Sequence, residues 1–102
     1  MALTPKNTLE CETIMIGEHS FKRIFERGIK PEDVLNSVRN GEVIREYPDD
    51  KPYPSFLLLN FIDEQPLHVV VALNKTMSLC FVITVYVPDP EMWSKDFKNK
   101  IV

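Results

Sequence analysis

Three side chains suited to holding an anion recur every four residues near the start of the chain: His19, Arg23 and Arg27. At roughly 100° per residue, this spacing places them along one side of a helix. Guanidinium groups bind phosphate or carboxylate in pairs of hydrogen bonds, and an imidazole can move a proton near neutral pH. The stripe therefore suits phosphate chemistry, with Arg23 and Arg27 as anion ligands and His19 as an acid or base. The alternative is a solvated helix face on which Lys22 and Glu26 pair locally.

A second group of polar side chains is expected on the last two strands. We expect the final hairpin to pair Leu73 with Leu79, which places His68 opposite Thr84 and leaves Tyr86 diagonally beyond. An imidazole, a hydroxyl and a phenol on one pleat can serve as general acid or base with hydrogen-bonding support. The alternative is a structural histidine among ordinary strand residues. The same register assigns to the core face Val69, Val71, Leu73, Phe81, Ile83 and Val85.

The helix that carries the stripe has clear ends. We expect it to begin after Gly17 and to stop before Gly28, because glycine readily takes the left-handed conformation that ends a helix. Ile29 can then pack back on Ile24 in a Schellman motif. The side opposite the stripe carries Phe21, Ile24 and Phe25. The sequence does not decide whether this helix lies on the face that carries His68 or on the other face, so a shared cleft stays open.

The remaining elements form the predicted framework. A second helix starts at Pro31, which suits a first helical turn, and stops at Gly41. Apolar, β-rich runs predict strands at Glu42–Tyr47, Phe56–Ile62, Leu67–Leu73 and Leu79–Val87. Residues 9–16 suit a leading strand, and a short C-terminal helix capped by Asp89 is expected to dock Trp93 and Phe97 on the core. The predicted class is α+β: two short N-terminal helices packed on a four-stranded, mainly antiparallel sheet.

Composition limits the possible functions. With 102 residues and a net charge of -3, the chain is expected to form a single domain over 1–102, and any contact with RNA must be local. No apolar run is long enough to span a bilayer, and Met1–Pro5 lacks the parts of a secretory signal, so we expect a cytoplasmic protein. Cys11 and Cys80 stand outside any C-x-x-C motif and are expected to be reduced thiols. No motif indicates a metal or another cofactor.

Several motifs occur in an order that resembles one family. They are His19-x-x-x-Arg23-x-x-x-Arg27-Gly28-Ile29, Gly41-Glu42-Val43-Ile44, Tyr47-Pro48, Pro66-Leu67-His68-Val69-Val70, Ile83-Thr84-Val85-Tyr86 and Pro88-Asp89. Over about residues 14–98 the chain resembles the small prokaryotic family called domain of unknown function 4258. Its helix-helix-sheet order is similar to that of the RelE and ParE toxins, small cytosolic proteins that cleave messenger RNA or inhibit gyrase and pair with an antitoxin. That link is an analogy of fold.

The resemblance implies that the recurring polar positions are His19, Arg23, Arg27, His68, Thr84 and Tyr86. One hypothesis is a metal-independent ribonuclease with an antitoxin-like partner, in which His68 or His19 takes the 2′-hydroxyl proton. The arginines would then stabilise the phosphate, while Tyr86 orients it or donates a proton. The acidic balance of this chain departs from the basic toxins. The alternative is a non-catalytic interaction module that binds a partner protein or forms a homodimer, which predicts apolar surface at the sheet edge or beside Trp93.

Overall fold

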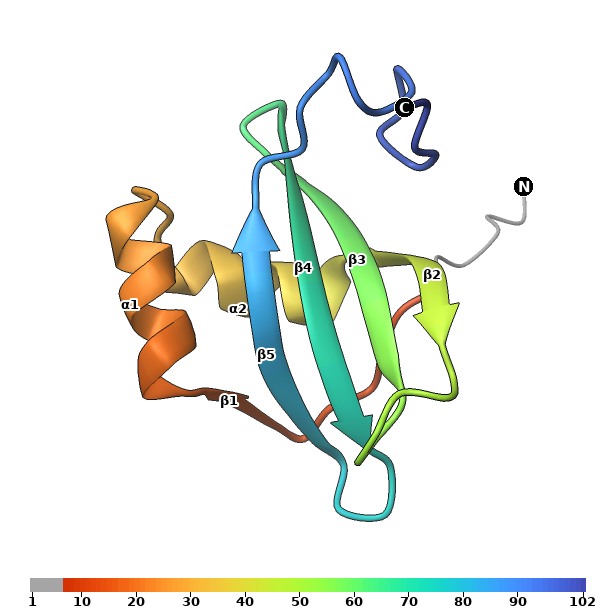
Figure 1. Cartoon of the computed structure of the whole chain (residues 1–102). Helices are drawn as coiled ribbons and strands as arrows, with labels where there is room; N and C mark the ends of the chain where they lie inside the picture. The colour runs from red at the N-terminus through yellow and green to blue at the C-terminus, as the bar shows by residue number, and fades with distance from the viewer. Residues whose placement is uncertain (1–6) are drawn as a thin grey trace, which may run out of the picture.

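The computed structural model describes residues 7–102 and contains two helices and a five-stranded sheet (Figure 1). Residues 1–6, where the sequence shows no secretory signal, lie outside the described part. In chain order the elements are β1 (Thr13–Ile16), α1 (Glu18–Glu26), α2 (Pro31–Asn40), β2 (Glu42–Tyr47), β3 (Ser55–Ile62), β4 (Gln65–Asn74) and β5 (Leu79–Tyr86). The predicted α+β class is confirmed, and the leading segment adds the fifth strand.

The sheet has the strand order β1-β5-β4-β3-β2. Strands β2 to β5 form an antiparallel meander, whereas β1 runs parallel to the first half of β5, from Leu79 to Val82. Both helices lie between β1 and β2 in the chain, and α2 crosses behind the strands in Figure 1. The view of that figure therefore looks onto the face of the sheet that the helices leave uncovered, which we call the open face.

The main core lies between the helices and the opposite, helix-covered face. Successive strand residues point to alternate faces, so every second residue of β4 contributes to it. Among its buried members are Ile24, Val34, Val38, Leu58, Leu67, Val69, Val71, Cys80, Val82 and Val85. No helix among residues 7–102 has the length and apolar character needed to cross a membrane.

The predicted helix ends are confirmed. Gly28 has a φ of 69°, and the amides of Gly28 and Ile29 donate to the carbonyls of Phe25 and Ile24, as in a Schellman motif. The end of α2 requires a glycine at position 41 for a different reason. A Cβ atom there would lie 2.4 Å from the carbonyl oxygen of Ser37, so the close approach of the backbone excludes a side chain.

The predicted register of the last hairpin is wrong by one residue. Asn74 pairs with Leu79, because the Asn74 side chain accepts the amide of Met77 and closes the turn within residues 75–78. A bulge at Ile83 then shifts the pairing by one more residue, so beyond it the register differs from the predicted one by two residues. The observed register differs from the predicted one in three consequences for the placement of side chains.

The first consequence is that Phe81 and Ile83 lie on the open face, where Phe81 stacks on Tyr53, while Cys80 and Val82 enter the main core. The others are that Tyr86 lies directly opposite His68 and that Thr84 pairs with Val70. The turn and the bulge each shift the pairing by one residue, and a shift of two residues leaves the alternation of faces unchanged, so His68, Thr84 and Tyr86 still share one face.

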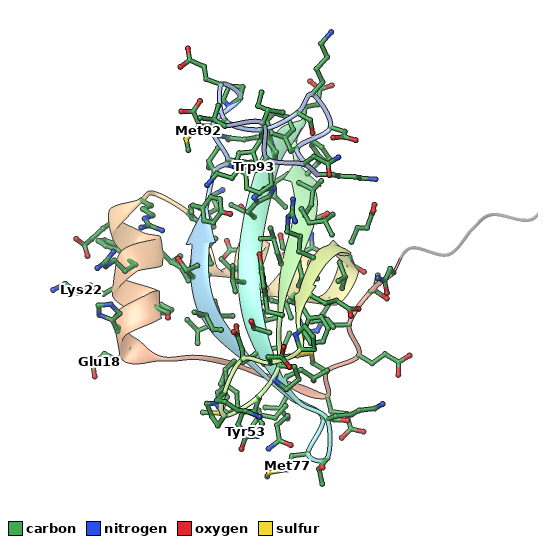
Figure 2. All side chains as sticks on the ribbon, turned by 45° about the vertical axis from the view of Figure 1, so that its right-hand side comes forward. Glu18, Lys22, Tyr53, Met77, Met92 and Trp93 are labelled. Atoms are coloured by element: carbon green, nitrogen blue, oxygen red, sulfur yellow. A yellow bond between two sulfur atoms is a disulfide. The ribbon has the colours of Figure 1, made fainter. Side chains whose placement is uncertain are left out.

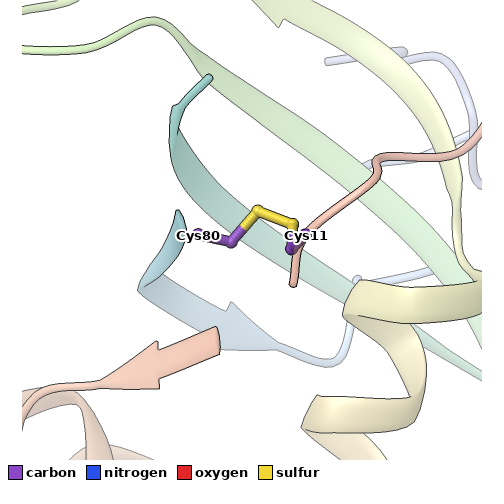
Figure 3. The surroundings of a disulfide bond; sticks show 2 residues. All are labelled: Cys11 and Cys80. Atoms are coloured by element: carbon purple, nitrogen blue, oxygen red, sulfur yellow. A yellow bond between two sulfur atoms is a disulfide. The ribbon is translucent and has the colours of Figure 1, made fainter. Parts of the chain in front are cut away.

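The two cysteines form a disulfide, so the expectation of reduced thiols is wrong (Figure 3). Cys11, just before β1, bonds to Cys80 at the start of β5, with Cα atoms 5.8 Å apart and a sequence separation of 69. Pairing of β1 with β5 brings these distant positions together, which spacing along the chain cannot reveal. Disulfides are typical of oxidising compartments, so this bond does not favour the cytoplasmic location that was expected from the lack of an apolar span and of a secretory signal.

The C-terminal segment, residues 88–102, forms turns instead of the predicted helix. Asp89 caps a single turn, in which its carboxylate accepts the amide of Glu91 and its carbonyl accepts the amide of Trp93. The helix does not continue, because the carboxylate of Asp96 binds the hydroxyl of Ser94 and a nearby amide, which favours a turn. The predicted docking of Trp93 on the sheet is confirmed: Trp93 is buried against His68 of β4, and Figure 2 shows it where the C-terminal segment meets the strands.

Candidate functional site

His68 lies on the open face of β4 but is fully buried, because the C-terminal segment covers it. Its Nε2 lies 2.9 Å from the carbonyl oxygen of Phe97, and its Nδ1 lies 3.1 Å from the hydroxyl of Tyr86. A carbonyl can only accept, so Nε2 carries the proton and Nδ1 accepts from the phenol. The indole of Trp93 packs edge to face on the imidazole, with ring centroids 4.5 Å apart. Both nitrogens of His68 are therefore occupied by protein groups.

Burial also sets the protonation of this pair. Desolvation lowers the pKa of His68 below its ordinary value, against a smaller opposing effect of the Phe97 carbonyl. Desolvation, followed by the neighbouring Tyr47, raises the pKa of Tyr86. Both groups are neutral at pH 7, and the imidazole is shielded from any ligand. In this geometry His68 fastens the C-terminal segment to the sheet.

The stripe on α1 has a different setting. His19 and Arg23 are exposed, whereas Arg27 reaches β5 and its guanidinium donates to the carbonyl of Val85. The hydroxyl of Ser20 donates to the carbonyls of Val82 and Ile83 at 3.2 Å.

These contacts follow from the short length of β1. Because β1 pairs with β5 only as far as Val82, the rest of β5 is an open sheet edge. Helix α1 covers that edge with polar side chains, so the guanidinium of Arg27 binds the backbone carbonyl of Val85. Sequence reasoning missed Ser20, because the open sheet edge that its hydroxyl contacts cannot be recognised in the sequence.

The structure does not bring the two predicted groups together. His68, Thr84 and Tyr86 lie on the open face, whereas His19, Arg23 and Arg27 belong to a helix that packs on the helix-covered core through Ile24. Only Arg27 is tied to the sheet, at its edge. A single cleft containing the imidazole of His68 and the arginines is therefore absent from the described residues.

A groove of about 400 Å³ opens on the open face beside Tyr86. It is lined by Arg45, Tyr47, Leu57, Val70, Tyr86, Trp93 and Lys100, and we call it the tyrosine groove. Arg45 and Tyr47 reach it from β2, where a register shift at Ile44 turns both toward the open face. Lys100 comes from the C-terminal segment, where its backbone pairs with that of Trp93 in an isolated β-bridge.

Sequence reasoning missed these groove residues, although the alternation of Glu42–Tyr47 already placed Arg45 and Tyr47 on one side. Thr84 is half-buried and pairs with Val70, one of the residues of the groove floor. No cluster of three or more metal-ligating side chains occurs among residues 7–102.

A model for the family described as domain of unknown function (DUF4258) matches residues 16–87. The chain belongs to the DUF4258 family. The matched region of this DUF4258 domain spans both helices and β2 to β5, and it ends before the C-terminal segment that covers His68. No curated protein and no solved structure matches the chain, and nothing supports a relation to the RelE and ParE toxins. The function of this DUF4258 domain must therefore be argued from its surface.

Helix α1 exposes two aromatic side chains on the surface of the domain. Of the three apolar side chains opposite the stripe, Ile24 is buried, whereas 48% of Phe21 and 79% of Phe25 are exposed. Helix α1 rests on the sheet edge through a narrow strip that contains Ser20, Ile24 and Arg27. The two phenylalanines lie one turn apart on the flank of this strip and reach solvent.

Proposed function

We propose that this DUF4258 domain is a non-catalytic interaction module that forms a homodimer through α1. The observation that carries the proposal is the exposed pair Phe21 and Phe25. Burial of one phenylalanine side chain contributes roughly 1.5–3 kcal/mol, and a symmetric contact would bury four such rings. A small helix that leaves two adjacent rings in solvent is suited to docking on an apolar surface.

Charge on the same helix favours a second copy as the occupant. In an antiparallel α1 pair centred near Ile24, Lys22 of each protomer comes opposite Glu26 of the other, and Phe21 comes beside Phe25. Within residues 7–102 neither Lys22 nor Glu26 forms an ion pair. In Figure 2 the Lys22 side chain points from α1 away from the sheet, as pairing with another molecule requires. The helix surface is thus self-complementary in both apolar and charged groups.

The ribonuclease hypothesis lacks such an observation. It requires an imidazole and arginines at one scissile phosphate, within hydrogen-bond reach of the reacting atoms. His68 is buried with both nitrogens occupied, and Arg27 binds a backbone carbonyl. His19 and Arg23 remain on the exposed helix without a second catalytic group from the open face. The geometry therefore favours association over catalysis.

Sedimentation velocity over a range of concentrations tests the dimer. We expect the native chain to dimerise and Phe25→Glu to be monomeric at the same concentrations. The matched control is Met77→Glu, since Met77 is 66% exposed in the β4–β5 loop and takes the same new charge far from α1. Lys22→Glu should weaken the dimer, and adding Glu26→Lys should restore it.

Two results would overturn this proposal. A native chain that stays monomeric at millimolar concentration shows that α1 does not self-associate, and a heterologous partner such as an antitoxin-like protein would then be the occupant to seek. A dimer that is unaffected by Phe25→Glu would place the interface elsewhere. Circular dichroism spectra of all variants should match that of the native chain, which confirms that each is folded.

A further inference from the structure

The tyrosine groove carries positive charge, as a site that binds anions does. Arg45 and Lys100 line it from two different elements, and no aspartate or glutamate lines it. Within the described residues the single ion pair joins Lys98 to Glu42, so both groove cations lack an acidic partner in the protein. Two unpaired cations on one concave surface attract a doubly charged anion more than a singly charged one.

The phenols of the groove complement these cations. The hydroxyl of Tyr86 donates a hydrogen bond to Nδ1 of His68, and its raised pKa keeps it neutral, so it adds no negative charge to the groove. Tyr47 lies near enough to Tyr86 to influence that pKa, and its hydroxyl forms no hydrogen bond within the described residues. The hydroxyl of Tyr47 is therefore free to donate to a bound oxyanion.

The rest of the groove is apolar and aromatic. Leu57 and Val70 form its floor from adjacent positions on β3 and β4, and Trp93 and the two tyrosines add aromatic rings. A volume of about 400 Å³ falls within the usual size of small-molecule sites. Such a surface accommodates a flat ring next to the charged groups, because aromatic side chains stack on planar ligands.

We infer that the tyrosine groove binds a phosphate monoester carried on a planar ring, the chemistry of a nucleoside monophosphate. Arg45 and Lys100 hold the phosphate, Tyr47 donates to it, and the ring packs on the apolar floor. The same chemistry occurs in a free nucleotide and at the phosphorylated end of an RNA strand. A long phosphodiester backbone is disfavoured, since the chain carries a net charge of -3 and the groove has only two cations.

Calorimetric titration of the full chain with adenosine 5′-monophosphate tests this site. We expect saturable binding, much weaker binding of adenosine, and a loss of about tenfold or more in affinity for both Arg45→Gln and Lys100→Gln. The matched control is Arg23→Gln, which removes the same charge from the exposed face of α1 and should leave affinity unchanged. A Phe25→Glu variant should also bind normally, so this site can succeed or fail independently of the dimer.

Two short oligoribonucleotides, one with a 5′-phosphate and one without, distinguish the sources of the ligand. Tighter binding of the phosphorylated strand than of the free nucleotide would keep the site and assign it to an RNA end. Equal binding of the two strands would overturn a monoester site. The inference also fails if the native chain shows no binding at millimolar nucleotide, or if Arg45→Gln binds as well as the native chain while retaining its circular dichroism spectrum.

Discussion

Replacement of His68 by leucine tests the interpretation that this residue fastens the C-terminal segment to the sheet. Leucine has a similar bulk but no nitrogen, so the carbonyl of Phe97 and the hydroxyl of Tyr86 both lose their partner. An unsatisfied buried polar group costs about 1–3 kcal/mol. The half-buried Tyr86 hydroxyl can turn to water in the groove, so its cost belongs at the low end. We expect His68→Leu to lower the free energy of unfolding by roughly 2–4 kcal/mol.

The pH dependence gives a sharper test than the size of the loss. The pKa of His68 is lowered in the folded chain, whereas in the unfolded chain it returns to the ordinary value near 6.5. Between these two values the unfolded state binds more protons, so the stability falls as the pH decreases from about 6.5 toward the folded pKa. The slope contributed by this one group approaches, at most, about 1.4 kcal/mol per pH unit.

Urea denaturation at pH 7.5 and pH 5.5 measures the effect. The native chain should lose more stability between these values than His68→Leu does, because the other titrating groups cancel in the difference. His19→Gln, which removes the exposed histidine and leaves the hydrogen bonds of His68 in place, is the matched control. The reasoning is refuted if the native chain and His68→Leu lose the same stability on acidification, or if acidification stabilises the native chain relative to the variant.

Two further predictions concern the stability of the fold. Reduction of the bond between Cys11 and Cys80 should lower the free energy of unfolding by up to about 4 kcal/mol, the chain-entropy value for a separation of 69 residues, as measured by urea denaturation with and without a reducing agent. An unchanged midpoint would contradict it, and a Cys11→Ser variant should not respond to the reducing agent. Gly41→Ala should cost about 1–3 kcal/mol because its Cβ would meet the carbonyl of Ser37, whereas Gly17→Ala, with open space around its Cβ, should leave the thermal midpoint nearly unchanged.

Local signals in the sequence were sufficient for much of the framework. Gly28 with Ile29 marked the end of α1, and Pro31 with Gly41 marked the limits of α2. These signals act through neighbouring residues, since a left-handed glycine or a first-turn proline needs no distant contact. The strands and the α+β class followed from their apolar periodicity, which reflects burial on one or both faces of a sheet.

Register and edge contacts were beyond such signals. One residue of difference in the turn at Asn74 moved Phe81 from the core to the open face, because side chains alternate along a strand. The short reach of β1 left part of β5 uncovered, and that open edge, which the sequence does not display, is what engages Arg27. Because α1 contacts the sheet only through a narrow strip at that edge, the side chain of Phe25 remains exposed.

The sequence by itself determined the two N-terminal helices, the order of the strands along the chain and the shared face of Thr84 and Tyr86, which alternate on one strand. Tertiary structure alone decided that His68 is enclosed, that Cys11 meets Cys80, and that Arg45 and Lys100 line one groove. The physical reason is the sequence separation between the residues that interact. Caps, turns and periodicity are set by residues a few positions apart, whereas burial, cross-linking and the convergence of charges depend on which distant segments the sheet brings side by side.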